Sequence, residues 1–135
     1  MTLGLEDREI LINYRIEQAK EIVSEVEHHI VNGFLKTAIN RIYYGMFYSL
    51  LALALKYRFE TSKHSQLIGW FNKNFIHTGI VEVKYGKLIN EMFILRTKTD
   101  YEVYENPSLD QVNIYYQDMK LFISEIEKLL IPDNQ

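Results

Sequence analysis

The stretch AINRIYYGMFYSLLALAL, residues 38–55, decides the fold. Its apolar side chains would surround a helix axis on every side, which is typical of a helix at the centre of a bundle. Its uncharged part, Ile42 to Leu55, is shorter than the roughly 20 residues that cross a bilayer, so we expect no membrane association. We predict a central helix from about Phe34 to Tyr57, in which Gly45 permits a close helix crossing.

The segments on either side have the spacing of amphipathic helices. Apolar residues three and four apart predict helices over about 6–31, 63–77, from 81 to near Asp100 or Tyr104, and 108–130. The predicted inner face of the fourth of these five helices is Val81, Tyr85, Leu88, Met92 and Leu95. No useful alternating strand pattern is present. The sequence therefore predicts an all-α, antiparallel four- or five-helix bundle, formed by a single domain over residues 1–135.

Turn and capping residues mark the expected helix ends. The predicted stops are Asn32-Gly33, Gly79, Asn106-Pro107 and Pro132. Thr61 or Ser62 is the expected cap of the third helix. Ser108, followed three residues later by Gln111, matches a capping box at the start of the fifth helix.

The composition excludes several classes of protein. The chain of 135 residues is 47% apolar and has no cysteine, which removes disulfides, thiolate catalysis and cysteine-ligated metal sites. Its histidines lack the spacing that places two ligands on one helix face, and its glycines form neither a P-loop nor a dinucleotide fingerprint. We therefore expect no metal and no cofactor. The acidic N-terminus does not resemble a signal peptide, so we expect the protein in the cytoplasm.

The net charge of −3 is unevenly distributed. Residues 1–35 carry three basic and seven acidic side chains, residues 36–98 carry ten and three, and residues 99–135 carry two and eight, giving −4, +7 and −6. Acidic outer helices that neutralise a basic middle within one bundle would explain this pattern. The sharper alternative is a local anion site built from the middle segment.

Two arginines stand in apolar surroundings, where a charge needs a partner or a ligand. Arg41 opens the aromatic stretch of the central helix, and Arg96 follows Met92-Phe93-Ile94-Leu95. Asp100 lies four residues after Arg96 and is therefore its neighbour on the helix surface. This pair is either an ordinary ion pair or a guanidinium fork for phosphate oxygens that Asp100 orients.

Aromatic and basic residues nearby could extend such an anion site. Tyr44, with its neighbouring tyrosines beside Arg41, could stack a base, although such a cluster is also typical of a bundle core. His64 follows Lys63 at an expected helix start, where a phosphate could bind, although capping with solvent exposure is the simpler interpretation.

Three stretches together resemble the HEPN family (higher eukaryotes and prokaryotes nucleotide-binding). They are Ala38-Ile39-Asn40-Arg41-Ile42-Tyr43-Tyr44-Gly45-Met46-Phe47-Tyr48, then Ser62-Lys63-His64-Ser65, then Arg96 with Asp100-Tyr101. The likeness spans about 12–130 and is greatest to the small stand-alone bacterial and archaeal branch. It implies a helical bundle, usually a homodimer, that is often encoded beside a minimal nucleotidyltransferase in a toxin–antitoxin-like pair.

Many members of that family are metal-independent ribonucleases, and the resemblance implies which residues would carry the activity. Their signature is an arginine followed after four to six residues by a histidine. Arg96 matches the arginine and Thr97 the polar residue that often follows it, but the histidine positions hold Tyr101, Glu102 and Val103. The degenerate motif thus leaves Arg96, Asp100 and Tyr101 as the catalytic candidates. Because metal-free RNA cleavage needs a group with a pKa near 7, tyrosine is a poor substitute for histidine.

Three hypotheses follow. The first is a domain that binds a nucleotide or RNA phosphate at Arg96, helped by Lys98, Arg41, Tyr44 and His64, with weak or lost ribonuclease activity and a nucleotidyltransferase partner. The second is an active ribonuclease toxin that uses Tyr101 or Glu102, or draws His64 into the cleft. The third is a structural adaptor in which Arg41, Arg96 and Asp100 form a buried ionic network.

Overall fold

The computed structural model describes residues 4–101 and 107–131. Its helices are α1 (Leu5–Val31), α2 (Leu35–Lys56), α3 (His64–Phe71), the π-helical segment η1 (Asn72–Ile76), α4 (Val83–Tyr101) and α5 (Leu109–Leu130). The described ranges contain no β-strand, so the predicted all-α bundle is confirmed. None of their helices is long and apolar enough to cross a membrane.

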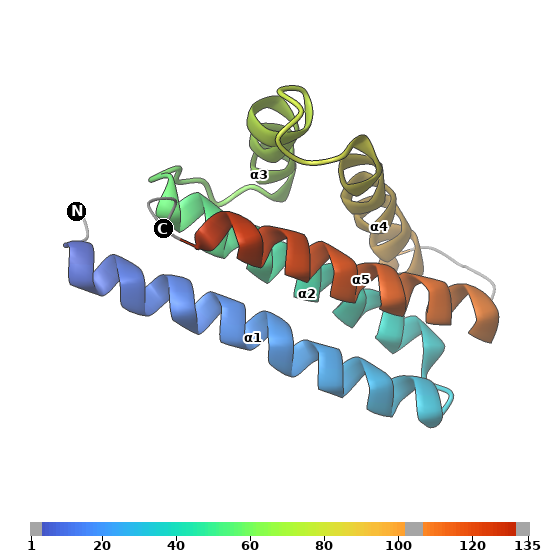
Figure 1. Ribbon diagram of the computed structural model, residues 1–135. Helices are drawn as coiled ribbons and strands as arrows, with labels where there is room; N and C mark the ends of the chain where they lie inside the picture. Colours follow the sequence, from blue (N-terminus) through green and yellow to red (C-terminus); the bar gives the residue numbers. More distant parts are fainter. Residues whose placement is uncertain (1–3, 102–106, 132–135) are drawn as a thin grey trace.

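The long helices α1, α2 and α5 lie side by side, and α3 and α4 stand together along one side of this trio (Figure 1). α1 is antiparallel to α2 and α5. α2 and α5, by contrast, point in the same direction, because α3 and α4 carry the chain back to the end of the bundle at which α2 begins (Figure 1).

Helix α2 is the central helix, as its sequence predicts. It packs against α1, α3, α4 and α5, and Ile42, Leu50 and Leu53 are completely buried. The predicted close crossing at Gly45 is confirmed: a Cβ atom there would lie 2.8 Å from Sδ of Met119 and 3.3 Å from Cγ2 of Ile22. Only glycine lets α1 and α5 approach α2 at this level.

Most predicted helix ends are confirmed. Gly33 and Gly79 have φ angles of 76° and 81°, the left-handed geometry of helix stops. The Ser108 hydroxyl accepts a hydrogen bond from the Gln111 backbone N–H at 3.1 Å, as in a capping box. The stops at Asn106 and Pro132, and the possible helix end at Tyr104, lie outside the described residues.

The expected cap of the third helix was wrong. Lys63, not Thr61 or Ser62, is the residue that precedes α3, and its side chain makes no capping hydrogen bond. The Thr61 hydroxyl instead accepts a hydrogen bond from the Lys63 backbone N–H at 3.1 Å. The threonine therefore stabilises the turn before the helix. It does not cap the helix, because the N–H that it bonds belongs to Lys63, the residue that precedes α3.

The third and fourth helices differ from the prediction in two further respects. The expected continuous helix over 63–77 changes at Asn72 into the π-helical segment η1. α4 begins at Val83 rather than at Val81, because the Val81 N–H donates to the Phe75 carbonyl at 2.8 Å and so belongs to the preceding turn. On α4, Ile89 is completely buried, whereas Leu88 and Leu95 are half-buried.

A buried arginine, which the sequence pattern did not indicate, joins α1 to the end of α2. Arg8 is only 5% exposed, and its Nη1 donates to the Leu55 carbonyl at 3.0 Å. That carbonyl lies in the last turn of α2, where carbonyls lack helical partners and attract positive charge. Lys56 similarly donates to the Leu129 carbonyl of α5 at 2.8 Å.

Candidate functional site

Arg96 lies near the end of α4 and points across the first half of α2. Its side chain is only 11% exposed. The guanidinium carbon lies 5.1 Å and 5.2 Å from the ring centroids of Tyr43 and Tyr44, within cation–π range. Its Nη2 donates to the Tyr44 hydroxyl at 3.0 Å. Arg96 therefore contacts two tyrosines of the central helix.

The polar surroundings of Arg96 only partly satisfy it. The carboxylate of Asp100 is 3.9 Å from Nη1, too far for a hydrogen bond. That carboxylate instead accepts a hydrogen bond from the Asn40 side chain at 2.9 Å. The Nε atom of Arg96 is buried and has no partner among the described residues. The guanidinium thus keeps donors that have no acceptor among the described residues.

His64, at the first residue of α3, joins the same cluster. Its ring stacks on Phe47 at 4.0 Å between centroids, and its Nδ1 is hydrogen-bonded to the Tyr43 hydroxyl at 2.7 Å. Burial, together with the positive charge of Arg96, lowers the pKa of His64 below its usual 6.5. Burial also raises the pKa of the Tyr43 hydroxyl, so that this group stays protonated.

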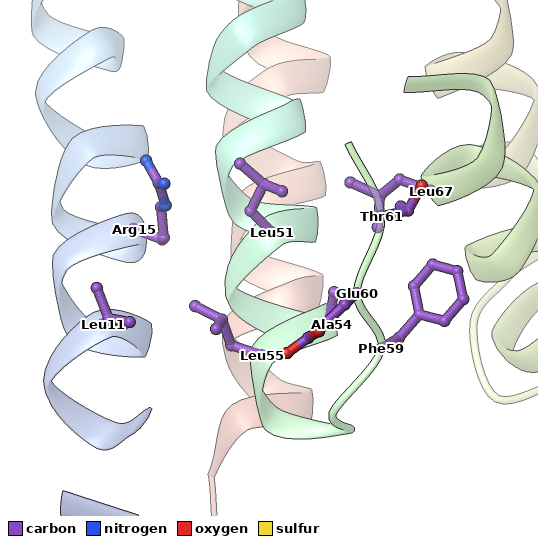
Figure 2. A pocket seen from close by; sticks show the side chains of 9 residues that line it. All are labelled: Leu11, Arg15, Leu51, Ala54, Leu55, Phe59, Glu60, Thr61 and Leu67. Carbon is purple, nitrogen blue, oxygen red and sulfur yellow. The ribbon is translucent and has the colours of Figure 1, made fainter. Parts of the chain in front are cut away.

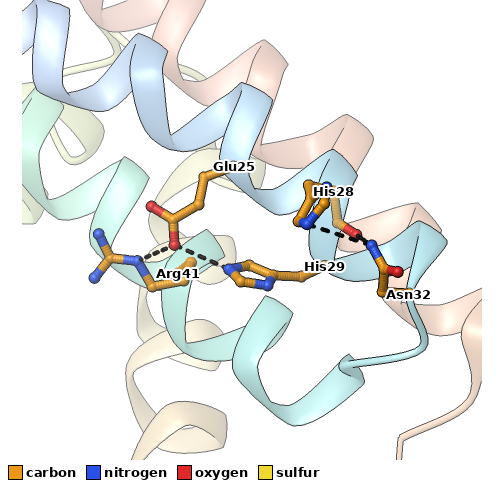
Figure 3. A network of polar contacts seen from close by, with 5 residues as sticks. All are labelled: Glu25, His28, His29, Asn32 and Arg41. Atoms are coloured by element: carbon orange, nitrogen blue, oxygen red, sulfur yellow. Dashed lines mark hydrogen bonds and ion pairs between the residues drawn. The ribbon is translucent and has the colours of Figure 1, made fainter.

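Arg41 lies on the neighbouring part of α2 and is held by a carboxylate. Figure 3 shows the Glu25 carboxylate of α1 between Arg41 and His29; each nitrogen lies 3.0 Å from the same oxygen. Burial alone would raise the pKa of Glu25, but hydrogen bonds from His29 and Arg41 outweigh it and hold this pKa below its usual range. The guanidinium carbon of Arg41 is 5.8 Å from the Tyr44 ring centroid. Tyr44 therefore contacts both candidate arginines.

The remaining candidates lie at the end of α4. Lys98 is exposed, and the Thr97 hydroxyl donates to the Phe93 carbonyl at 3.0 Å. Tyr101 is the last residue of α4, but its side chain lies outside the described part of the chain, as do Glu102 and Val103. The structure therefore brings together Arg96, Asp100, Tyr44 and His64, and Arg41 also contacts Tyr44.

Sequence reasoning did not single out four of the residues that build this site. Asn40 precedes Tyr44 by one helical turn, a spacing that could have placed it on the same face. Glu25 and His29 have the same spacing on α1. The contact of Phe47 with His64 joins two separate helices, and helical periodicity within one segment carries no signal for it.

An apolar hollow lies apart from this cluster, between α1 and α2. It has a volume of about 200 Å³ and lies towards the C-terminal end of α2, between Leu11 and Arg15 of α1 and the Phe59–Thr61 connection (Figure 2). None of the candidate site residues lines it. Within the described residues, no group of three or more His, Cys, Asp or Glu side chains could hold a metal ion.

The fold and this cluster define a small helical-bundle domain with a buried arginine at its polar site. The model of the HEPN domain family matches residues 12–129, and the chain belongs to this family. It is 33% identical over 126 residues to a protein of Thermotoga maritima named as a UPF0332 protein, covering 93% of this chain and 96% of that protein.

Two proteins of Methanocaldococcus jannaschii, both with the printed name "putative toxin", are also similar. One is 30% identical over 115 residues, which cover 85% of each chain. The other is 30% identical over 119 residues, covering 88% of this chain and 81% of that protein.

Proposed function

We propose that this HEPN domain binds a nucleotide or RNA phosphate at Arg96. The observation that carries this proposal is a guanidinium that is almost buried and yet keeps an unpartnered Nε. A buried donor without an acceptor is costly, and phosphate oxygens would satisfy it with short, charge-assisted hydrogen bonds. The faces of Tyr43 and Tyr44 hold the guanidinium in place before a ligand arrives.

Two further basic residues add positive charge near this position. Lys98 is exposed two residues after Arg96 on α4, and the guanidinium carbon of Arg41 lies 5.8 Å from the Tyr44 ring centroid. Because Glu25 is paired with Arg41, the contribution of Arg41 to phosphate binding is smaller than that of Arg96. We assign Lys98 to attraction of the polyanion and Arg96 to direct contact.

The toxin names of the two Methanocaldococcus jannaschii relatives support a role in a toxin–antitoxin-like pair. We propose that the protein acts as a homodimer in the cytoplasm, with a minimal nucleotidyltransferase as its partner. Size measurement of the purified protein, followed by co-purification with the protein encoded beside it, tests both parts. A monomer that captures no nucleotidyltransferase contradicts this part of the proposal.

Binding is tested by titrating a fluorescent single-stranded RNA at several salt concentrations. Affinity should fall with salt, and Arg96→Ala should weaken it by about tenfold or more, as loss of a charge-assisted contact does. Arg15→Ala is the matched control, because Arg15 also lies over two tyrosine rings, those of Tyr14 and Tyr48. Equal affinities of wild-type protein and Arg96→Ala would refute the proposal.

A second candidate function, ribonuclease activity, is favoured by the position of His64. When Nδ1 donates to the Tyr43 oxygen, Nε2 carries a lone pair that can take the proton of an RNA 2′-hydroxyl. The 2′-oxygen would attack the phosphorus, Arg96 would stabilise the charged oxygens, and the 5′-oxygen would leave with a proton from water. The products would be a 2′,3′-cyclic phosphate and a 5′-hydroxyl.

This activity is tested with purified protein, RNA and a chelator. Cyclic phosphate ends that disappear in both Arg96→Ala and His64→Ala support the ribonuclease. Intact RNA that still binds the protein would leave phosphate binding as the function.

A further inference from the structure

A polar groove lies between α3–η1 and α4, beside the Arg96 cluster. A hollow of about 190 Å³, lined in part by Ser65, Gly69 and Phe93, shares Asn72 and Asn90 with a second hollow of about 340 Å³. The two hollows are therefore neighbours along the same helices, and together we call them the α3–α4 groove. The larger one alone reaches the lower end of the range of roughly 300–1,000 Å³ that is usual for small-molecule sites.

Two glycines and the π-helical segment shape this groove. A Cβ atom at Gly69 would meet no atom within 4 Å, so this position is an open wall of the groove. A Cβ atom at Gly86 would lie 2.5 Å from Oδ1 of Asn72, so glycine lets that amide approach α4 closely. Asn72 is the first residue of η1, and a π-helical turn within a helix often marks a functional position.

Neutral amide groups dominate the polar lining of the groove. Nδ2 of Asn72 donates to the Ile68 carbonyl at 3.0 Å, which fixes the orientation of this amide. The Asn90 side chain is exposed and makes no hydrogen bond to the described residues. No carboxylate lines either hollow, whereas Lys87 and His77 line the far end. This lining suits a neutral ring with hydrogen-bonding edges that is attached to an anion.

The groove lies beside the aromatic cluster that surrounds Arg96. The Phe93 ring, which lines the groove, lies 5.8 Å from the Tyr43 ring and 6.4 Å from the His64 ring. Asn90 precedes Arg96 by six residues on α4, which corresponds to about 9 Å along the helix axis. One nucleotide spans such a distance from its phosphate to the far edge of its base.

From this arrangement we infer that the α3–α4 groove holds an unpaired nucleobase of the RNA whose phosphate binds Arg96. The inference rests on the proposed function and names its substrate as single-stranded RNA. The amides of Asn72 and Asn90 match the donor and acceptor pattern of a base edge, and Phe93 supplies an aromatic surface.

The test compares a single-stranded RNA with an abasic ribose-phosphate oligomer of the same length. Wild-type protein should bind the RNA about tenfold more tightly, the contribution of one stacked and hydrogen-bonded base. Gly69→Leu fills the groove at an exposed helical position where the structure leaves room, and Asn90→Ala removes the free amide. Each should reduce the preference for RNA while leaving the affinity for the abasic oligomer unchanged.

Asn74→Ala is the matched control, because Asn74 lies on η1 and its side chain donates to the Trp70 carbonyl at 2.9 Å. It should retain the preference for RNA. Equal binding of both oligomers by wild-type protein, or a preference that survives Gly69→Leu, would overturn the inference. A Gly69→Leu variant that changes only the oligomeric state would also overturn it, because the groove would then be a contact between copies.

Failure of the inference and failure of the proposed function give different results. If Arg96→Ala weakens binding of the abasic oligomer but the groove variants leave the RNA preference intact, phosphate binding stands and the base site is refuted. If Arg96→Ala weakens neither ligand, the proposed function fails as well.

Discussion

At the level of single residues, the surroundings of Arg96 distinguish a ligand site from a structural ion network. Among the described residues, Arg96 donates one hydrogen bond to the Tyr44 hydroxyl and has a distant carboxylate, that of Asp100, as its only ionic partner. In a structural network, removal of one member of a buried pair typically costs about 3–5 kcal/mol. The incomplete pairing of Arg96 predicts a much smaller effect on stability.

Replacing Arg96 with methionine tests this difference. Because methionine fills similar space without an unsatisfied charge, Arg96→Met should change the free energy of unfolding by less than about 1 kcal/mol. Urea denaturation of the variant and the wild type measures this change. A loss of about 3 kcal/mol or more would instead support the structural adaptor.

His64 should make stability depend on pH. Its pKa in the folded protein is lowered by burial and by Arg96, so the unfolded chain binds the proton more readily. Stability should therefore fall as the pH drops from 7 through 6.5 towards the lower pKa of the folded state. Urea denaturation across this range should show a shallower fall for His64→Gln, and equal slopes for both proteins would contradict the assignment.

At the level of helices, two glycines with different surroundings should respond oppositely to alanine. Gly45→Ala places a methyl group 2.8 Å from Met119, and overpacking of this kind typically costs about 1–3 kcal/mol. Gly69→Ala meets no neighbouring atom and should stabilise α3 by up to about 1 kcal/mol. Thermal denaturation measures both changes, and a stabilised Gly45→Ala variant would show that α1 and α5 can move apart.

The end of α2 offers a separate test of backbone strain. Arg58 has a φ angle of 58° and follows α2, where the Phe59 N–H bonds to the Ala54 carbonyl at 2.9 Å, as in a Schellman motif. Glycine has no penalty in this left-handed geometry, so Arg58→Gly should stabilise the protein by about 1 kcal/mol.

Arg58→Ala controls for the loss of charge, because it retains the Cβ atom that causes the strain. It should raise the melting temperature less than Arg58→Gly does. If both substitutions have the same effect, the charge and not the backbone geometry determines the stability at this position.

Helical periodicity predicted the elements well because it depends on neighbours within one segment. The expected helix over 6–31 is α1, Leu5–Val31, and the expected central helix is α2. The π-helical turn at Asn72 was not predicted. In such a turn each backbone N–H bonds to the carbonyl five residues earlier instead of four, and this change leaves the spacing of the apolar residues almost unchanged. The spacing of Arg96 and Asp100 predicted their proximity, but the Tyr43–His64 and Glu25–Arg41 pairs join separate helices and depend on how those helices pack.

For the whole molecule, the arrangement in Figure 1 predicts an order of local opening. α2 packs against α1, α3, α4 and α5, so opening it requires loss of most of the core. The segment formed by α3 and η1 has fewer neighbouring elements. Local openings with low free energy should therefore begin there.

Native-state amide hydrogen exchange tests this order. Amides around Leu50 and Leu53 should exchange only through global unfolding, whereas those of α3 and η1 should exchange faster. Equal protection of α2 and α3 would show that the molecule opens as one cooperative unit.

The buried Arg8 bears on how the protein should be trimmed for experiments. The family match starts at residue 12, yet Arg8 is buried and bonded to the end of α2. A fragment designed from the boundaries of the family alone would lose this link and expose the Leu55 carbonyl together with the apolar surface around it. The packed unit therefore extends beyond the residues that the family match covers, and proteins prepared for crystallisation or assays should retain the first turns of α1.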